Sequence, residues 1–150
     1  MKMLLIEDDK YKCDDIKKNV QKHFPNLLVD VVKSYKAGVM GALYGDYDLL
    51  LVDMTIPIYD SDDISNNGGS LKNGGELIVN EIYDEGKTIK FAIVTQYETF
   101  DGETLEAVEQ RLYRLCGENY LGSVKYCSYK EDWKDPLNNI IDNVIHINHR

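Results

Sequence analysis

The 150-residue chain lacks several features that mark particular classes of protein. Its only cysteines, Cys13, Cys116 and Cys127, lie far apart and have neither metal-ligand spacing nor the even number of a disulfide framework. No apolar run approaches the roughly 20 residues that cross a membrane. The first residues carry acids where a secretory signal needs an apolar stretch. We therefore expect buried or half-buried thiols in a cytoplasmic protein without membrane insertion.

The chain is also poor in positive charge. Its 17 Lys and Arg residues are outnumbered by 26 Asp and Glu residues, which leaves a net charge of −9, and no basic run forms a local patch. Nucleic-acid binding needs a positive face, so direct binding of nucleic acid is not expected. Neither a Gly-x-Gly-x-x-Gly nor a complete Gly-x-x-x-x-Gly-Lys-Ser/Thr motif occurs, because Gly86-Lys87-Thr88 is preceded by Glu81 where the motif needs its first Gly, and this argues against a nucleotide-binding enzyme.

What the chain does have is three short apolar runs that each end on polar side chains. The runs and the residues that follow them are 3–6 with Glu7-Asp8-Asp9, 49–52 with Asp53, and 91–94 with Thr95. Apolar runs without alternation are typical of parallel strands covered by helices on both faces. Ligands bind at the carboxyl ends of the strands in such a sheet. The acids and the hydroxyl are therefore predicted at the edge where the sheet would carry its chemistry.

Strand and helix patterns alternate five times along residues 1–150. Strands are predicted at 2–7, 27–32, 48–53, 89–95 and 119–127, each followed by a helix. The expected buried helix positions are Cys13, Ile16, Val20, Leu77, Ile78, Ile82, Leu105, Val108, Leu112, Leu115, Trp133, Leu137, Ile140, Ile141 and Val144. This alternation predicts an α/β fold, a flavodoxin-like (βα)5 doubly wound parallel sheet with strand order 2-1-3-4-5.

That strand order makes the first and third strands neighbours, which would place Glu7 and Asp8 beside Asp53. Clustered carboxylates repel one another unless a cation neutralises them. All-oxygen ligation suits Mg²⁺, which takes one or two carboxylates together with waters and a substrate phosphate. A carboxylate can also act as a nucleophile and form an aspartyl phosphate. The pattern predicts a magnesium site built to hold a phosphoryl group.

In order and on the expected strands, these residues resemble the receiver domain of two-component response regulators over nearly the whole chain. Glu7 and Asp8 match the acidic pair that ends the first strand of that family. Asp53, followed four residues later by Pro57, matches the phosphoacceptor. Thr95 matches the hydroxyl that senses the phosphoryl group. The resemblance implies Mg²⁺ held by Glu7, Asp8 and Asp53, and phosphorylation on Asp53.

The resemblance further implies a stand-alone signalling domain with no output domain. It would not be an enzyme beyond catalysing its own phosphorylation and dephosphorylation. A histidine kinase or a phosphotransfer protein would donate the phosphoryl group. The face formed by helix four, strand five and helix five would then bind a downstream protein. Whether the chain forms a homodimer stays open.

Two departures from the family pattern concern the phosphoryl site. The family ends strand five with a Lys, but Ser123 stands there in strict register, and Lys125 points to the same strand face two residues later. Either Lys125 reaches the phosphoryl group, or the lysine function is lost or comes from the long loop, for example from Lys72. Gln96 replaces the small residue usual after the Thr.

Other positions would tune the signal. Thr55 and Tyr97 occupy the two positions that set phosphoryl lifetime in the family, and a bulky Tyr97 predicts slow self-hydrolysis. Tyr120 resembles the switch aromatic on strand five. The polar loop 56–75 is longer than the family norm, and loops of such length are usually functional or disordered; it could be a lid or a docking surface.

A second function stays open from the sequence. The missing Lys and the presence of Gln96 also fit a receiver-like protein-interaction module that does not use phosphate. In that case Asp53→Asn would leave partner binding unchanged. Four tyrosines are expected to line a partner surface, namely Tyr59, Tyr97, Tyr126 and Tyr129.

Overall fold

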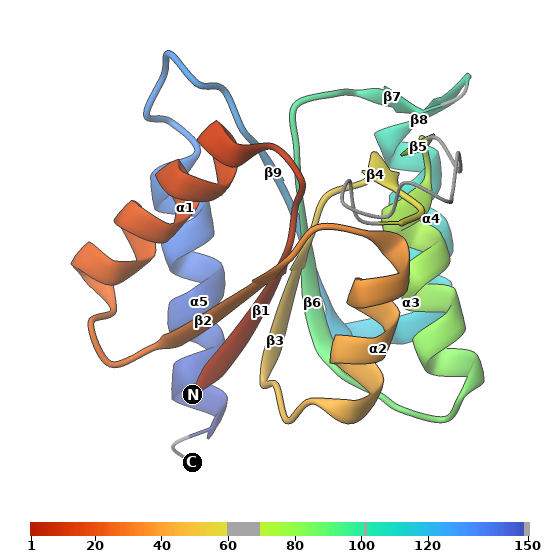
Figure 1. The fold of residues 1–150 in the computed structure, drawn as a ribbon, viewed down its shortest axis with the longest axis horizontal. Helices are drawn as coiled ribbons and strands as arrows, with labels where there is room; N and C mark the ends of the chain where they lie inside the picture. Colours follow the sequence, from red (N-terminus) through yellow and green to blue (C-terminus); the bar gives the residue numbers. More distant parts are fainter. Residues whose placement is uncertain (60–69, 101, 149–150) are drawn as a thin grey trace.

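The computed structural model describes residues 1–59, 70–100 and 102–148 (Figure 1). One parallel sheet has the order β2-β1-β3-β6-β9. Its strands are β1 (Lys2–Ile6), β2 (Leu28–Val32), β3 (Leu49–Val52), β6 (Lys90–Thr95) and β9 (Tyr120–Lys125). The helices are α1 (Lys10–His23), α2 (Tyr35–Tyr44), α3 (Gly74–Asp84), α4 (Leu105–Cys116), the 3-10 turn η1 (Gly117–Asn119) and α5 (Lys134–Asn148). The predicted flavodoxin-like (βα)5 sheet and its order are confirmed.

The helices form one layer on each side of the sheet (Figure 1). Helices α1 and α5 cover one face, and α2, α3 and α4 cover the other. Successive residues of β1 therefore alternate between two cores: Leu4 and Ile6 belong to the core under α2, α3 and α4, and Met3 and Leu5 to the core under α1 and α5. Both faces of the sheet are covered by helices, which is why the central strands are apolar without alternation.

Side-chain caps begin three of the helices. Asp9 accepts hydrogen bonds from the amides of Tyr11 and Lys12 at the start of α1. Ser34 caps α2, and Thr104 caps α4. Each cap satisfies an amide that the helix itself leaves without a partner. The cap at Asp9 matters most for the site, because it starts α1 directly after the acidic end of β1.

Some predicted core positions are wrong. Leu115 on α4 is 45% exposed, and Cys116 is buried in its place, because the 3.6-residue period carries the inward stripe from Leu112 to Cys116. Trp133 is buried but precedes α5. Tyr126, expected on a partner surface, is buried against Trp133 with ring centroids 5.2 Å apart.

Two short hairpins were not predicted from the sequence. Strands β4 (Ile56–Pro57) and β5 (Ser70–Leu71) pair across the segment predicted to be one long loop. Residues 60–69 of that segment lie outside the described part. Strands β7 (Thr99–Phe100) and β8 (Glu103–Thr104) pair just before α4. Among the described residues, no helix combines the length and apolar content that a membrane crossing requires.

Candidate functional site

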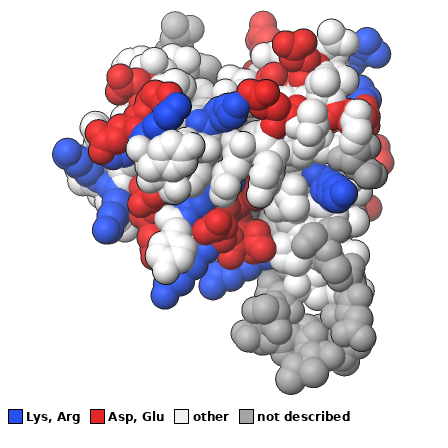
Figure 2. Space-filling model, turned by 90° about the horizontal axis from the view of Figure 1, so that it is seen from above, with Lys and Arg blue, Asp and Glu red and all other residues white. Residues whose placement is uncertain are grey.

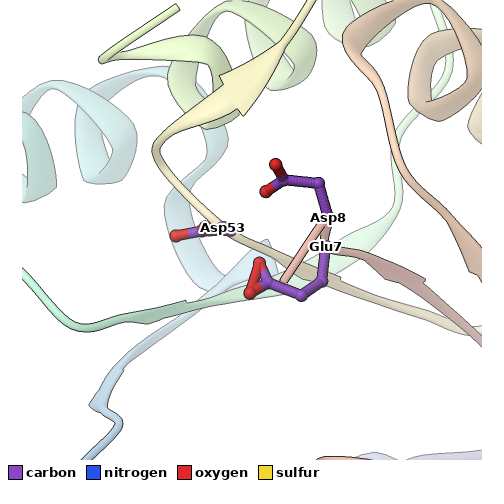
Figure 3. Close-up of side chains that lie close together, drawn as sticks. All are labelled: Glu7, Asp8 and Asp53. Carbon is purple, nitrogen blue, oxygen red and sulfur yellow. The ribbon is translucent and has the colours of Figure 1, made fainter. Parts of the chain in front are cut away.

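Three carboxylates meet at the carboxyl end of the sheet (Figure 3). Glu7 directly follows β1, and its amide bonds the carbonyl of Val32 at 3.0 Å. Asp53 directly follows β3, and its amide bonds the carbonyl of Ile6 at 3.0 Å. With Asp8, these residues offer oxygen atoms that all lie within 4.8 Å of one another. Long-range strand pairing thus builds the cluster that the sequence predicted.

The three carboxylates differ in burial. Glu7 is 1% exposed and Asp53 9% exposed, whereas Asp8 lies open to solvent. Burial raises the pKa of Glu7 to about 9; the charge of Lys12 opposes this shift and the charge of Asp53 adds to it. Partial burial of its carboxylate, followed by the charge of Asp53, also raises the pKa of Asp8. The negative charges of the cluster therefore repel one another.

A divalent cation fits this donor set. Oε1 of Glu7 is buried and accepts no hydrogen bond from any described residue. An orphaned carboxylate oxygen beside two further carboxylates is the kind of oxygen ligand set that Mg²⁺ takes. The exposed Asp8 leaves one side of the cluster open to water. Glu7, Asp8 and Asp53 are the residues that would hold the ion.

A buried lysine that the sequence reasoning missed sits within this cluster. Lys12, on the first turn of α1, is 1% exposed. Its Nζ lies 2.7 Å from the carbonyl oxygen of Val94, 3.2 Å from Oε1 of Glu7 and 3.3 Å from Oδ1 of Asp53. A signal was present: Lys12 lies four residues before Ile16, on the stripe that faces the sheet. A lysine on a helix face that packs against the core needs buried acidic groups to pair with its charge.

Lys125, the first of the alternatives for the missing strand-five lysine, does not contact Asp53. Its side chain is 58% exposed and its ammonium pairs with Glu98. A bulge in β9 sets its register, because Tyr120 pairs with Phe91 but Ser123 pairs with Ile93, and Gly122 has a φ of +110°. Lys125 consequently ends opposite Thr95, at the solvent-exposed end of the strand. Lys72, the other candidate, accepts a 3.5 Å hydrogen bond from Thr55 through its backbone carbonyl.

Thr95 ends β6 on the far side of β3 from Glu7. It is fully buried, and its Oγ1 accepts a 3.3 Å hydrogen bond from the amide of Tyr97. Gln96 is exposed, and Tyr97 is 57% exposed beside it. Because β3 and β6 are neighbours in register, the hydroxyl of Thr95 belongs to the same sheet edge as Asp53.

Tyr120 turns inward from β9. It is 3% exposed, and its hydroxyl donates a 2.6 Å hydrogen bond to Glu109 on α4. Its ring packs edge-on against Tyr113, with centroids 4.7 Å apart. Burial and the nearby carboxylate of Glu109 raise the pKa of the Tyr120 hydroxyl. Tyr120 therefore joins the edge strand of the sheet to α4.

Gly75 allows α3 to begin against the acidic loop. A Cβ at this position would lie 2.6 Å from the carbonyl oxygen of Asp53 and 3.1 Å from Cα of Met54. Real Cβ atoms do not approach backbone so closely, so a larger residue would push α3 away from Asp53. The Gly74-Gly75 pair is thus required by the close approach of helix and loop.

Comparison of the sequence with known proteins finds a relative of similar length. No protein-family model matches the chain. The Detocs response regulatory protein DtcB of Enterobacter cloacae (strain JD6301) is 25% identical over 143 residues, which are 91% of this chain and 95% of that protein.

Solved structures show the same architecture. A CheY-like response regulator receiver domain protein from Methanospirillum hungatei JF-1 superimposes with a TM-score of 0.65 at 15% identity, over 97% of this chain and 94% of that one. The response regulator TrrA of Thermotoga maritima, solved with Mg²⁺ and BeF, gives a TM-score of 0.60 at 14% identity, over 93% and 97%. The resemblance carried by the acidic pair, the strand-end Asp and the strand-end Thr is confirmed: this chain has the receiver-domain fold of the response regulators.

Proposed function

We propose that the protein is a receiver that is phosphorylated on Asp53 with Mg²⁺ bound by Glu7, Asp8 and Asp53. One observation carries the proposal: a nearly buried strand-end Asp lies with two further acids at the carboxyl edge of the sheet, in a cluster whose oxygen atoms could hold a cation. The TrrA structure with Mg²⁺ and BeF supports it, because that fold neighbour holds both at once. The name of DtcB, a response regulatory protein, supports the signalling role.

The proposed reaction transfers a phosphoryl group to the side chain of Asp53. A carboxylate oxygen of Asp53 attacks phosphorus and forms an oxygen–phosphorus bond. The bond between phosphorus and the donor breaks, and its electron pair leaves with the donor group, which takes up a proton from water. Bound Mg²⁺ would neutralise the charge of the acids and of the phosphoryl oxygens. Glu7 and Asp8 orient that charge beside the acceptor, and a histidine kinase or phosphotransfer protein is the proposed donor.

The output surface is proposed to be the face made by α4, β9 and α5. Thr95 ends the strand next to Asp53, and the next strand, β9, carries Tyr120, whose hydroxyl is bonded to Glu109 on α4. A phosphoryl group that attracts the Thr95 hydroxyl would act on the β6–β9 edge and through it on α4. Such a local charge event can bias a surface between two arrangements, which a downstream protein then reads.

The test is phosphoryl uptake from a small donor. The protein is incubated with Mg²⁺ and acetyl phosphate, and the intact mass is read beside Asp53→Asn. The matched control is Asp46→Asn, since Asp46 is an exposed acid outside the site. Uptake of one phosphoryl group by the wild type and by Asp46→Asn, but not by Asp53→Asn, is expected. Equal uptake by Asp53→Asn would contradict the assignment of the acceptor.

A phosphate-independent interaction module is the second candidate. It is favoured by one observation, that strand β9 brings no cation to Asp53. In that case Asp53→Asn would bind the downstream protein as tightly as the wild type does. Treatment with acetyl phosphate would change the affinity of neither protein for that partner. A partner captured only after phosphorylation of Asp53 would exclude this candidate.

A further inference from the structure

We infer that Lys12 on α1 supplies the cation that binds the phosphoryl group on Asp53, in the role that receiver domains give to a lysine on the fifth strand. The inference rests on the proposed function, because it requires Asp53 to be the acceptor. It assigns to this chain a phosphoryl ligand from a different element of the fold.

The contacts of Lys12 place its charge at the acceptor. Among the described residues, Lys12 is the cation within 4.0 Å of an Asp53 carboxylate oxygen, at 3.3 Å from Oδ1. The ammonium also donates hydrogen bonds to the carbonyl of Val94 at 2.7 Å and to Oε2 of Glu7 at 3.4 Å. An ammonium has three N–H donors, so these two bonds leave one donor for a further oxygen. The ion pair with Asp53 places that charge beside the carboxylate on which the phosphoryl group would form.

Several features hold Lys12 in this position. Oδ1 of Asp9 accepts a hydrogen bond from the backbone amide of Lys12 at 3.2 Å, which fixes the first turn of α1. The carbonyl of Val94, on the strand β6, accepts a hydrogen bond from the ammonium and so fixes its position. The ring of Tyr126 lies beside the ammonium, with its centroid 5.9 Å from Nζ. The lysine is therefore positioned in advance and does not have to be ordered on phosphorylation.

The fifth strand has no lysine in position to compete. Ser123 pairs with Ile93 after the bulge at Gly122, and Lys125 is turned outward to Glu98. Among the residues drawn in colour, acidic and basic side chains are intermixed over the end of the molecule where the strands finish (Figure 2). Strand β9 thus brings no lysine to Asp53, and helix α1 brings Lys12 in its place.

Phosphorylation would strengthen this contact. The carboxylate of Asp53 carries one negative charge, and its acyl phosphate presents three phosphoryl oxygens with more negative charge. The third N–H of the ammonium can bond a phosphoryl oxygen while the other two keep Val94 and Glu7. Lys12 forms no covalent bond in this step. Its part is to stabilise charge that grows as the oxygen–phosphorus bond forms.

The test compares Lys12→Met with Lys125→Met in the full chain. Each variant is examined for Mg²⁺ affinity, for affinity to beryllofluoride in the presence of Mg²⁺, and for the rate of phosphoryl uptake from acetyl phosphate. Trp133, the single tryptophan, packs on Tyr126 beside Lys12 and reports binding by its fluorescence. Loss of one charged hydrogen bond predicts affinity for beryllofluoride about 10- to 100-fold lower in Lys12→Met.

Three outcomes decide the inference. The inference is supported if Lys12→Met binds beryllofluoride weakly and takes up the phosphoryl group slowly, while its Mg²⁺ affinity is kept or raised and Lys125→Met behaves like the wild type. If Lys12 had only a structural role, Lys12→Met would lose Mg²⁺ affinity as well. If the wild type is modified and Lys12→Met is modified equally, only the role of Lys12 is overturned. If the wild type takes up neither phosphoryl group nor beryllofluoride, the proposed function fails and the inference with it.

Removing a buried cation can unfold the protein, since it leaves two acids unpaired. Lys12→Arg provides the second variant, because it keeps the charge but presents a rigid planar fork in place of a compact ammonium. We expect Lys12→Arg to fold, to bind Mg²⁺ and to bind beryllofluoride more weakly than the wild type. Wild-type affinity for beryllofluoride in a folded Lys12→Arg, together with a loss in Lys125→Met, would assign the role to Lys125 instead.

Discussion

The guanidinium of Arg111 on α4 holds both carboxylate oxygens of Glu76 on α3. Nε lies 2.7 Å from Oε2, and Nη2 lies 2.9 Å from Oε1. Glu76 is 5% exposed, and it stands one residue after Gly75, where α3 approaches Asp53. Arg111 also bonds Glu103 on β8. One side chain therefore ties together α3, α4 and the β7–β8 hairpin.

Arg111→Met should destabilise the protein by about 2 kcal/mol, because the buried carboxylate of Glu76 loses a bidentate charged partner. Urea unfolding followed by circular dichroism measures the change. The double variant Glu76→Gln with Arg111→Met should recover part of the loss, since the unpaired charge is then gone. Arg114→Met, on the same helix, serves as the control. An unfolding midpoint in Arg111→Met equal to that of the wild type would show that the pair contributes nothing.

The stability of the metal-free protein should fall as pH rises. Burial raises the pKa of Glu7 from 4.5 to about 9, so between these values the folded protein binds a proton that the unfolded chain has released. That proton stabilises the fold at low pH, and the contribution is lost as pH rises through the folded pKa. Mg²⁺ replaces the proton, so its stabilising effect should grow with pH.

Thermal unfolding with EDTA and with Mg²⁺, at about pH 6 and about pH 8.5, tests this linkage. Glu7→Gln carries no titrating proton at this position and should flatten the pH dependence of the metal-free protein. A difference between the EDTA and Mg²⁺ conditions that stays the same at both pH values would mean that Glu7 is ionised throughout.

Gly75→Ala should weaken both the fold and the metal site. The added Cβ would lie 2.6 Å from the carbonyl oxygen of Asp53, so α3 and the loop must separate. Overpacking of this kind costs about 2 kcal/mol. Gly86→Ala is the matched control: its Cβ meets open space, and its φ of +86° strains only the backbone far from the acids. Calorimetry should show weaker Mg²⁺ binding in Gly75→Ala alone; equal affinities in the two variants would argue against a link between α3 and the site.

Tyr97→Ala should shorten the lifetime of the phosphorylated protein. Tyr97 follows Thr95 by two residues, and its amide bonds the Thr95 hydroxyl oxygen at 3.3 Å. Its large ring is expected to keep water from the acyl phosphate, so self-hydrolysis of the wild type should be slow. Loss of the phosphoryl mass after removal of the donor gives the rate. The phosphorylated form of Tyr129→Ala, changed at an 84% exposed position, should hydrolyse as slowly as that of the wild type. Hydrolysis of phosphorylated Tyr97→Ala at the wild-type rate would contradict shielding by the Tyr97 ring.

Much of the fold follows from local sequence patterns. Residues 3–6, 49–52 and 91–94 are apolar without alternation, and only a strand covered on both faces accommodates such a run. The polar residues that follow them must then meet at one edge, so the strand patterns alone predict that Glu7 and Asp53 lie together. The caps at Asp9 and Ser34 are equally local, because each uses a side chain within three residues of the amide that it satisfies.

Tertiary structure decided which lysine meets Asp53. The pairing of β9 with β6 places Lys125 opposite Thr95, and the ion pair with Glu98 holds its side chain in solvent; counting alternate residues along the strand does not reveal this. Lys12 reaches the acids only because α1 packs across the ends of β1 and β6, where Val94 accepts from its ammonium. The sequence by itself determined the strands and the acids at their ends, since these depend on neighbouring residues. The cation that balances those acids was decided by contacts between distant segments, because charge is paired by distance in space and not by order along the chain.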